Sequence, residues 1–75
     1  MDKFNIKVFR DDEIVNSQND LDEILNLYQV QLLQLSKMLE NEFENIPLFE
    51  IQVIVGDRIF CKIPELYNIE RVIYL

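Results

Sequence analysis

The sequence predicts a two-layer α+β domain in which one long helix packs on a small, mostly antiparallel sheet. Three observations predict this fold class: alternation at residues 3–9, helical periodicity at residues 19–45, and two alternating segments joined by Gly56 and Asp57. Alternation is typical of a half-buried strand, and apolar spacings of three and four are typical of an amphipathic helix. We expect a single domain at residues 1–75, with the element order β-α-β-β and a fourth β element or a short helix at the C-terminus.

The first predicted strand is KFNIKVF at residues 3–9. Every second residue from Phe4 to Val8 is apolar, so one face of this strand can be buried against the helix. The polar segment at residues 10–19 is predicted to be a loop, with a turn of structure at Ile14–Val15.

The predicted helix begins near Asp20, because Glu23 three residues later completes a capping-box pattern; Asn19 is an equally plausible N-cap. It should end before Pro47, because the residue before a proline avoids the helical region. These limits give a helix of about 25 residues, or roughly 37 Å at 1.5 Å per residue. An apolar seam along one side is expected to pack on the sheet: Leu21, Ile24, Leu25, Tyr28, Leu32, Leu35, Leu39 and Phe43.

The predicted helix also carries apolar residues outside this seam. Lys37 is the only charged residue between Glu23 and Glu40, whereas a solvated helix usually carries many charges. Depletion of charge around apolar residues is typical of the core of a contact surface. We expect an interface with a second copy or another protein at four residues, unless loops or the C-terminal segment cover one flank: Leu27, Val30, Leu33 and Met38.

The last part of the sequence predicts a hairpin and one more element. Residues 48–55 alternate as a strand, and Gly56–Asp57 predict a two-residue turn with Gly at the first position of type II′. Residues 58–63 are the return strand, which Pro64 ends. Residues 69–75 predict a last strand, although a short helix fits the same apolar residues.

Composition limits the class of protein. The net charge of −7 argues against general affinity for nucleic acid or anionic membrane, and it favours a partner with a basic surface. One Cys excludes an internal disulfide. Because the sequence lacks both an apolar run long enough to span a membrane and a signal-peptide pattern, we expect the cytosol of a bacterial or host cell.

The sequence offers little catalytic chemistry. It has no His and one Gly, so the commonest general base and the glycine-rich phosphate-binding loops are absent. Cys61 alternates with Ile59 and Ile63, which indicates a buried structural thiol. The acidic residues do not fit a calcium-binding loop. We expect no enzymatic activity, no metal and no cofactor.

Acidic residues gather in two segments, with six acids at residues 11–23 and four at residues 40–50. Acids suit the start of a helix, but they are unfavourable at its end, so the second group suggests a role outside folding. We expect six acidic residues to bind the partner: Asp11, Asp12, Glu13, Glu40, Glu42 and Glu44.

These features favour a small acidic inhibitor that binds a protein. Its sharpest form is a phage or mobile-element protein that blocks a host nucleic-acid enzyme, such as a defence nuclease, partly by imitating nucleic-acid charge. Abundant Ile and Asn without Ala or Thr suit an A+T-rich genome of that kind. The alternative is a homo-oligomeric module, such as a dimer, that uses the apolar face of the helix. A basic sheet face with Lys3, Lys7, Arg58, Lys62 and Phe60 could instead contact RNA.

Overall fold

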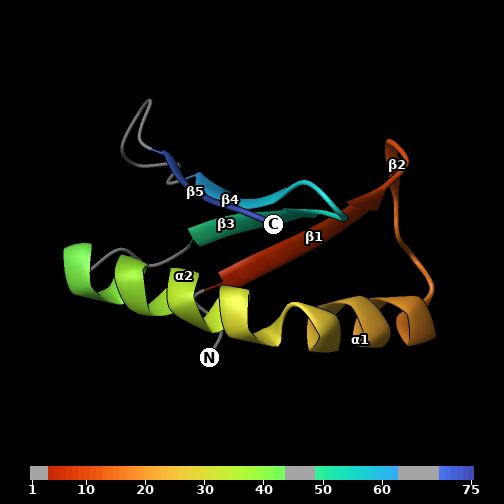
Figure 1. Cartoon of the computed structure of the whole chain (residues 1–75), viewed down its shortest axis with the longest axis horizontal. Helices are drawn as coiled ribbons and strands as arrows, with labels where there is room; N and C mark the ends of the chain where they lie inside the picture. Colours follow the sequence, from red (N-terminus) through yellow and green to blue (C-terminus); the bar gives the residue numbers. More distant parts are fainter. Residues whose placement is uncertain (1–3, 44–48, 63–69) are drawn as a thin grey trace.

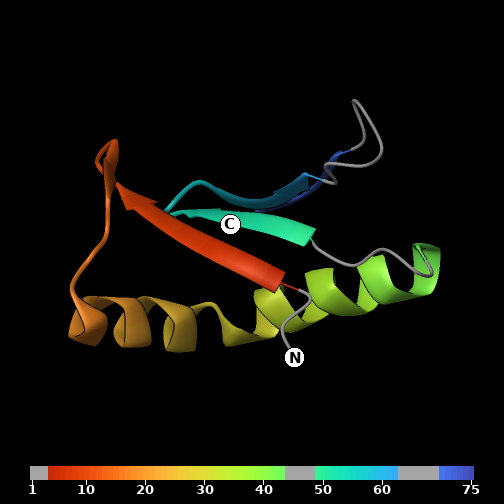
Figure 2. The same cartoon turned by 180° about the vertical axis from the view of Figure 1, so that it is seen from behind.

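In the computed structural model, two helices lie on one face of a five-stranded sheet (Figures 1 and 2). The structure describes residues 4–43, 49–62 and 70–75. The elements in chain order are β1 (Phe4–Arg10), β2 (Glu13–Ile14), α1 (Gln18–Leu27), α2 (Gln29–Glu42), β3 (Phe49–Ile54), β4 (Arg58–Lys62) and β5 (Glu70–Tyr74). The α+β class and the two layers predicted from the sequence are confirmed.

The strands lie in the order β2-β1-β3-β4-β5. β1 and β3 are parallel, because α1 and α2 carry the chain back along the sheet before β3 begins (Figure 1). The other three pairings are antiparallel, so the sheet is mixed but mostly antiparallel, as predicted.

A tight hairpin joins β1 to β2. Asp11 and Asp12 have φ angles of 53° and 65°, and Arg10 pairs with Glu13 across the turn. Two consecutive positive φ angles in a two-residue connection are the pattern of a type I′ turn. The predicted loop at residues 10–19, with a turn of structure at Ile14–Val15, therefore contains the short strand β2, which is too short to show alternation in the sequence.

The first helix begins one turn earlier than the capping-box pattern predicts. Ser17 is the N-cap of α1, and its hydroxyl accepts a hydrogen bond from the backbone N–H of Asp20 at 3.4 Å. Asn19 and Asp20 both lie inside the first turn, so the prediction that either caps the helix is wrong. A Ser oxygen at this position meets one of the amide donors that a helix start leaves unpaired.

The predicted single long helix is also wrong, because it is interrupted at Tyr28. This residue has φ −101° and ψ 21°, and it separates α1 from α2. Helical hydrogen bonds still cross the break, since the N–H of Leu32 donates to the carbonyl of Tyr28 at 2.9 Å. The Tyr28 hydroxyl accepts a hydrogen bond from the backbone N–H of Gly56 at 3.0 Å, so the break is attached to the β3–β4 turn.

The β3–β4 connection has three residues, not the predicted two. Ile54 pairs with Arg58, and the N–H of Asp57 donates to the carbonyl of Ile54 at 2.9 Å. The four-residue turn runs from Ile54 to Asp57, so Gly56 is its third residue, with φ 79°. The prediction that Gly56 is the first central residue of a type II′ turn is therefore wrong.

The C-terminal element is a strand, and the alternative of a short helix is wrong. β5 pairs with β4 along its whole length. The predictions for residues 64–69 lie outside the described residues.

The core lies between the helices and the sheet. The seam predicted on the helix packs into it: Ile24, Leu35 and Leu39 are buried, and the other seam residues pack against them. Cys61 is fully buried among these apolar side chains, as predicted. The sheet contributes Val8, Phe49, Ile51, Val53 and Ile59 to this core, and Val15 joins them from the segment between β2 and α1.

Candidate functional site

The side of α1 and α2 that faces away from the sheet carries exposed apolar side chains. Their exposed fractions are 68% for Leu27, 65% for Val30, 54% for Leu33 and 38% for Met38. We call these four residues the helix surface. The seam residues on the opposite side pack in the core, so the helix surface lies outside the buried cluster. A group of exposed large apolar residues on one side of a molecule is a feature of interaction sites.

An apolar groove of about 320 Å³ lies beside the helix surface, and Leu33 lines it. The groove runs between α2 and the outer edge of β1, because β2 pairs only with Phe9 and Arg10 and does not reach the first half of β1. Ile6 is 39% exposed at this edge, although its side chain lies on the core side of the sheet. The groove has seven lining residues: Ile6, Leu25, Gln29, Leu32, Leu33, Ser36 and Ile51.

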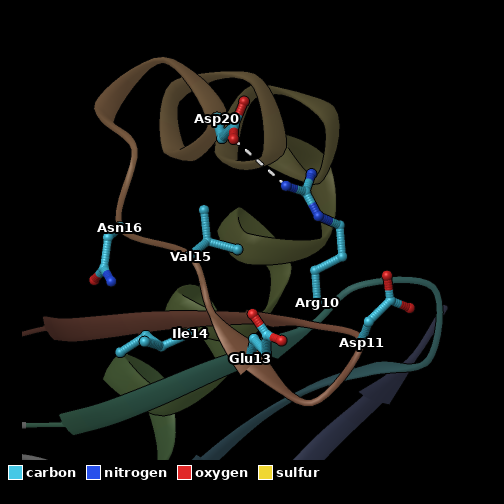
Figure 3. Close-up of a pocket in the computed structure, with 7 residues that line it drawn as sticks. All are labelled: Arg10, Asp11, Glu13, Ile14, Val15, Asn16 and Asp20. Atoms are coloured by element: carbon cyan, nitrogen blue, oxygen red, sulfur yellow. Dashed lines mark hydrogen bonds and ion pairs between the residues drawn. The ribbon is translucent and has the colours of Figure 1, made fainter.

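The acids of the β1–β2 hairpin are exposed at one end of the molecule (Figure 1). Asp11 and Glu13 line a polar hollow of about 380 Å³ between this hairpin and the start of α1 (Figure 3). Within it, an Arg10 Nη atom lies 3.4 Å from an Asp20 carboxylate oxygen. Asp20 is therefore partly neutralised, whereas no ion pair is formed by Asp11, Asp12 or Glu13 within the described part of the chain.

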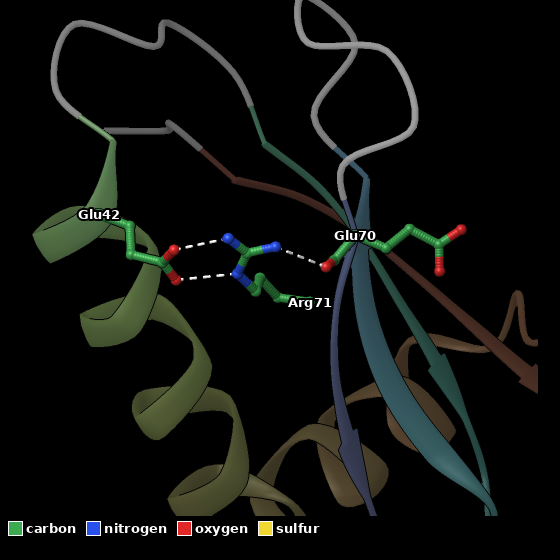
Figure 4. Close-up of polar contacts among 3 residues, drawn as sticks. All are labelled: Glu42, Glu70 and Arg71. Carbon is green, nitrogen blue, oxygen red and sulfur yellow. Dashed lines mark hydrogen bonds and ion pairs between the residues drawn. The ribbon is translucent and has the colours of Figure 1, made fainter.

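At the other end of the helices, Glu42 forms a two-pronged ion pair with Arg71 of β5 (Figure 4). The two nitrogen–oxygen distances are 2.9 and 2.6 Å. The hydrogen bonds from Arg71, together with its positive charge, hold the pKa of Glu42 below its usual range. The interpretation that acids at the helix end have no role in folding is wrong for Glu42. Glu40 is exposed, and Glu44 lies outside the described residues.

The Glu42–Arg71 pair should make the free energy of unfolding depend on pH in the acidic range. Because folding lowers the pKa of Glu42, its contribution is present above the usual carboxyl pKa and is lost as pH falls through the lowered value. We expect Glu42→Gln to lower the urea midpoint at pH 7, and the difference from wild type to shrink toward pH 3. Glu40→Gln is the matched control. A deficit of Glu42→Gln that stays constant across this range would contradict the prediction.

Cys61 is positioned for packing. Burial raises the pKa of its thiol to about 11, and the negative charge of Glu50 adds to this effect. The thiol therefore stays protonated near neutral pH, and a protonated thiol is a poor nucleophile.

The sheet face away from the helices carries a second group of apolar side chains, which were not predicted from the sequence. Lys7, Arg58, Phe60 and Lys62 share this face, as predicted, and Lys3 lies outside the described residues. The consecutive apolar residues around Ile54 are the sequence feature that indicates this second group. A strand that is apolar on both faces is expected to have apolar surface packed against each face. The members that were not predicted are Phe9, Ile14, Ile54, Val72 and Tyr74.

Comparisons with protein-family models, curated proteins and solved structures find no match to this chain. None of its described helices has the length and apolar character needed to cross a membrane. Across residues 4–43, 49–62 and 70–75, no three acidic or Cys side chains come together as candidate metal ligands. The function is therefore inferred from the surfaces described above.

Proposed function

We propose that this protein is a small non-enzymatic binding protein that attaches to another protein through the helix surface and the adjoining groove. One observation carries the proposal: Leu33 is 54% exposed and also lines the apolar groove. An apolar side chain of a partner can enter the groove while Val30 and Leu33 pack around it. Such an anchor in a pocket is the usual centre of a protein interface, and burying apolar area contributes about 25 cal/mol per Å².

The charge of the protein supports a partner with a basic surface. The net charge is −7, and the acids of the β1–β2 hairpin remain outside the ion pairs described above. Exposed charges of this kind mainly accelerate association and select the partner. In the narrower form of the proposal, the protein is a phage or mobile-element inhibitor in the cytosol. Its partner is then a nucleic-acid enzyme, whose binding groove is occupied partly by charge mimicry.

The test is affinity capture from a bacterial lysate, followed by affinity measurements on the purified captured protein. We expect Leu33→Glu to weaken binding at least about thirtyfold, which is the ~2 kcal/mol typical of a central apolar contact. Asn16→Glu, at an exposed position between β2 and α1, is the control for added charge, because it lies outside both the helix surface and the sheet. Unchanged affinity of Leu33→Glu would exclude the helix surface as the binding site.

The acidic hairpin has its own test with the same partner. Asp11→Asn, Asp12→Asn and Glu13→Gln together should slow association and reduce its dependence on salt, because exposed charges are screened over about 10 Å at 0.1 M salt. Equal rates for wild type and the triple variant would contradict charge mimicry by this hairpin but leave the apolar contact in place.

A second candidate function is a homo-oligomeric module whose helix surface binds another copy of the chain. The same exposed residues favour it. It predicts that Leu33→Glu lowers the molecular mass in light scattering, whereas a partner-binding helix surface leaves the mass unchanged.

A further inference from the structure

The sheet face opposite the helices has an ordered arrangement of side chains. Residues in register project from the same face, so the pairings define rows that cross the strands. One row contains Ile14, Phe9, Ile54, Arg58 and Tyr74. The next contains Lys7, Gln52, Phe60 and Val72, and the third contains Asn5, Glu50, Lys62 and Glu70. We call the residues of these three rows the open sheet face.

The open sheet face is more apolar than a solvated face of a sheet, which normally carries polar residues. Tyr74 is 76% exposed and Ile14 is 48% exposed. Phe9, Ile54 and Val72 are partly exposed between them. Both helices lie on the other side of the sheet, and no other described element covers this face (Figures 1 and 2).

The charge of this face differs from that of the whole protein. It carries three cations, Lys7, Arg58 and Lys62, against two carboxylates, Glu50 and Glu70, in a chain of net charge −7. Two copies can therefore bring these faces together without opposing the excess negative charge of the chain. Two of these cations lie over the Phe60 ring, with Arg58 Cζ 5.2 Å and Lys62 Nζ 5.9 Å from its centre. Arg58 also pairs with Asp57.

We propose that the open sheet face binds the same face of a second copy, which gives a symmetric dimer with the helices on the outside. The two-fold axis runs parallel to the strands, between β3 and β4. Rotation about this axis places β4 of the second copy over β3, and β5 of the second copy over β1. Each row of one copy then faces the same row of the other copy. Glu50 then lies over Lys62 of the second copy, and Phe9 lies over Tyr74 of the second copy.

The remaining contacts of this arrangement are also compatible. Ile54 meets the aliphatic part of Arg58, Gln52 lies opposite Phe60, which is 8% exposed in the monomer, and no like charges oppose each other. An axis perpendicular to the strands through the middle row would instead place Lys62 over Arg58 and Lys7 over Lys7. Sheets that pack face to face keep their strand directions within about 30° of each other, which the parallel axis satisfies.

The dimer would present two helix surfaces that point away from each other. A partner with two binding sites would then be held by both, and avidity can exceed either single affinity by a factor of about 100 or more. The dimer itself does not depend on the proposed function, because it uses different residues from the helix surface.

A pair of charge reversals tests the dimer by sedimentation equilibrium. Glu50→Lys alone places two lysine side chains together at both symmetric contacts, and Lys62→Glu alone places two carboxylates together. We expect each variant to dimerise at least about tenfold more weakly than wild type, because opposed like charges are strongly unfavourable in an interface. An equimolar mixture should regain the dimer, since both contacts of the mixed pair join opposite charges. Each chain in the mixture carries only one of the two substitutions. A restored pairing of opposite charges within a single chain therefore cannot explain this recovery.

Two further variants test whether the chain remains folded and which face of the molecule forms the dimer. Tyr74→Lys changes a residue that is 76% exposed, so it should weaken the dimer without unfolding the chain, as checked by circular dichroism. Val30→Glu on the helix surface should leave the dimer intact. The proposal is overturned if wild type stays at the monomer mass of 9.0 kDa, if the mixture does not regain the dimer, or if Val30→Glu dissociates it while Tyr74→Lys does not. Loss of partner binding by Leu33→Glu with an intact dimer would separate the two proposals.

Discussion

We expect Leu39→Ala to lower the free energy of unfolding by about 3 kcal/mol, within the 2–5 kcal/mol typical of a large-to-small change in a core. Leu39 is 0% exposed and belongs to the cluster formed by α2 and the sheet. A chain of 75 residues has a total stability of about 4–11 kcal/mol, so this loss removes a large part of it. The urea midpoint should fall by roughly 3 M if the denaturant slope is about 1 kcal/mol per M.

Leu33→Ala is the matched control, because it makes the same chemical change in the same helix. Leu33 is 54% exposed, and surface substitutions usually change stability by less than about 0.5 kcal/mol. Both proteins would be unfolded in urea at one protein concentration and followed by circular dichroism. Equal midpoints for the two variants would show that α2 packs on the sheet with a face other than the one that carries Leu39.

The distinction between these two leucines was predictable from the sequence. The seam containing Leu39 follows helical spacing along the predicted helix, and Leu33 falls well away from its centre. Alternation likewise predicted the strands around Val8, Val53 and Ile59. These predictions succeed because a helix or strand that buries one face has apolar residues at a regular spacing, and this spacing can be read from the local sequence.

Features that depend on contacts distant in sequence were not predictable in the same way. Neither Gly nor Pro marks the helix break at Tyr28; its hydroxyl meets Gly56, which lies 28 residues further along the chain. Glu42 was interpreted as an acid without a folding role because its partner, Arg71, is 29 residues away. The parallel pairing of β1 with β3 also joins distant segments, and alternation within one strand does not identify its neighbour.

Of the two candidate surfaces, one could be predicted from local spacing and the other depends on contacts between segments distant in sequence. The exposed apolar residues of the helix could be separated from the seam by their spacing alone. The open sheet face required the strand order, because Phe9, Ile54 and Tyr74 come from three different strands and form one row only after the register is known.

We expect Gly56→Ala to lower the free energy of unfolding by about 1–2 kcal/mol, which is the cost of a left-handed backbone for a residue with a Cβ atom. Gly56 has φ 79°, and a Cβ atom built there would meet nothing within 4 Å. The loss would therefore come from the backbone and not from a collision with neighbours. Gly56→Asn should lose less, because Asn adopts positive φ more readily than Ala. Urea unfolding of both variants gives the comparison, and an equal loss for Asn and Ala would contradict it.

The same substitution should also weaken the contact that holds the helix break, because the N–H of Gly56 donates to the Tyr28 hydroxyl at 3.0 Å. Tyr28→Phe alone should cost about 0.5–1.5 kcal/mol, the usual contribution of one hydrogen bond. If the backbone of residue 56 shifts in Gly56→Ala, the double variant should lose less than the two single losses together, since both remove the same interaction. Strictly additive losses would show that Gly56→Ala leaves this hydrogen bond undisturbed.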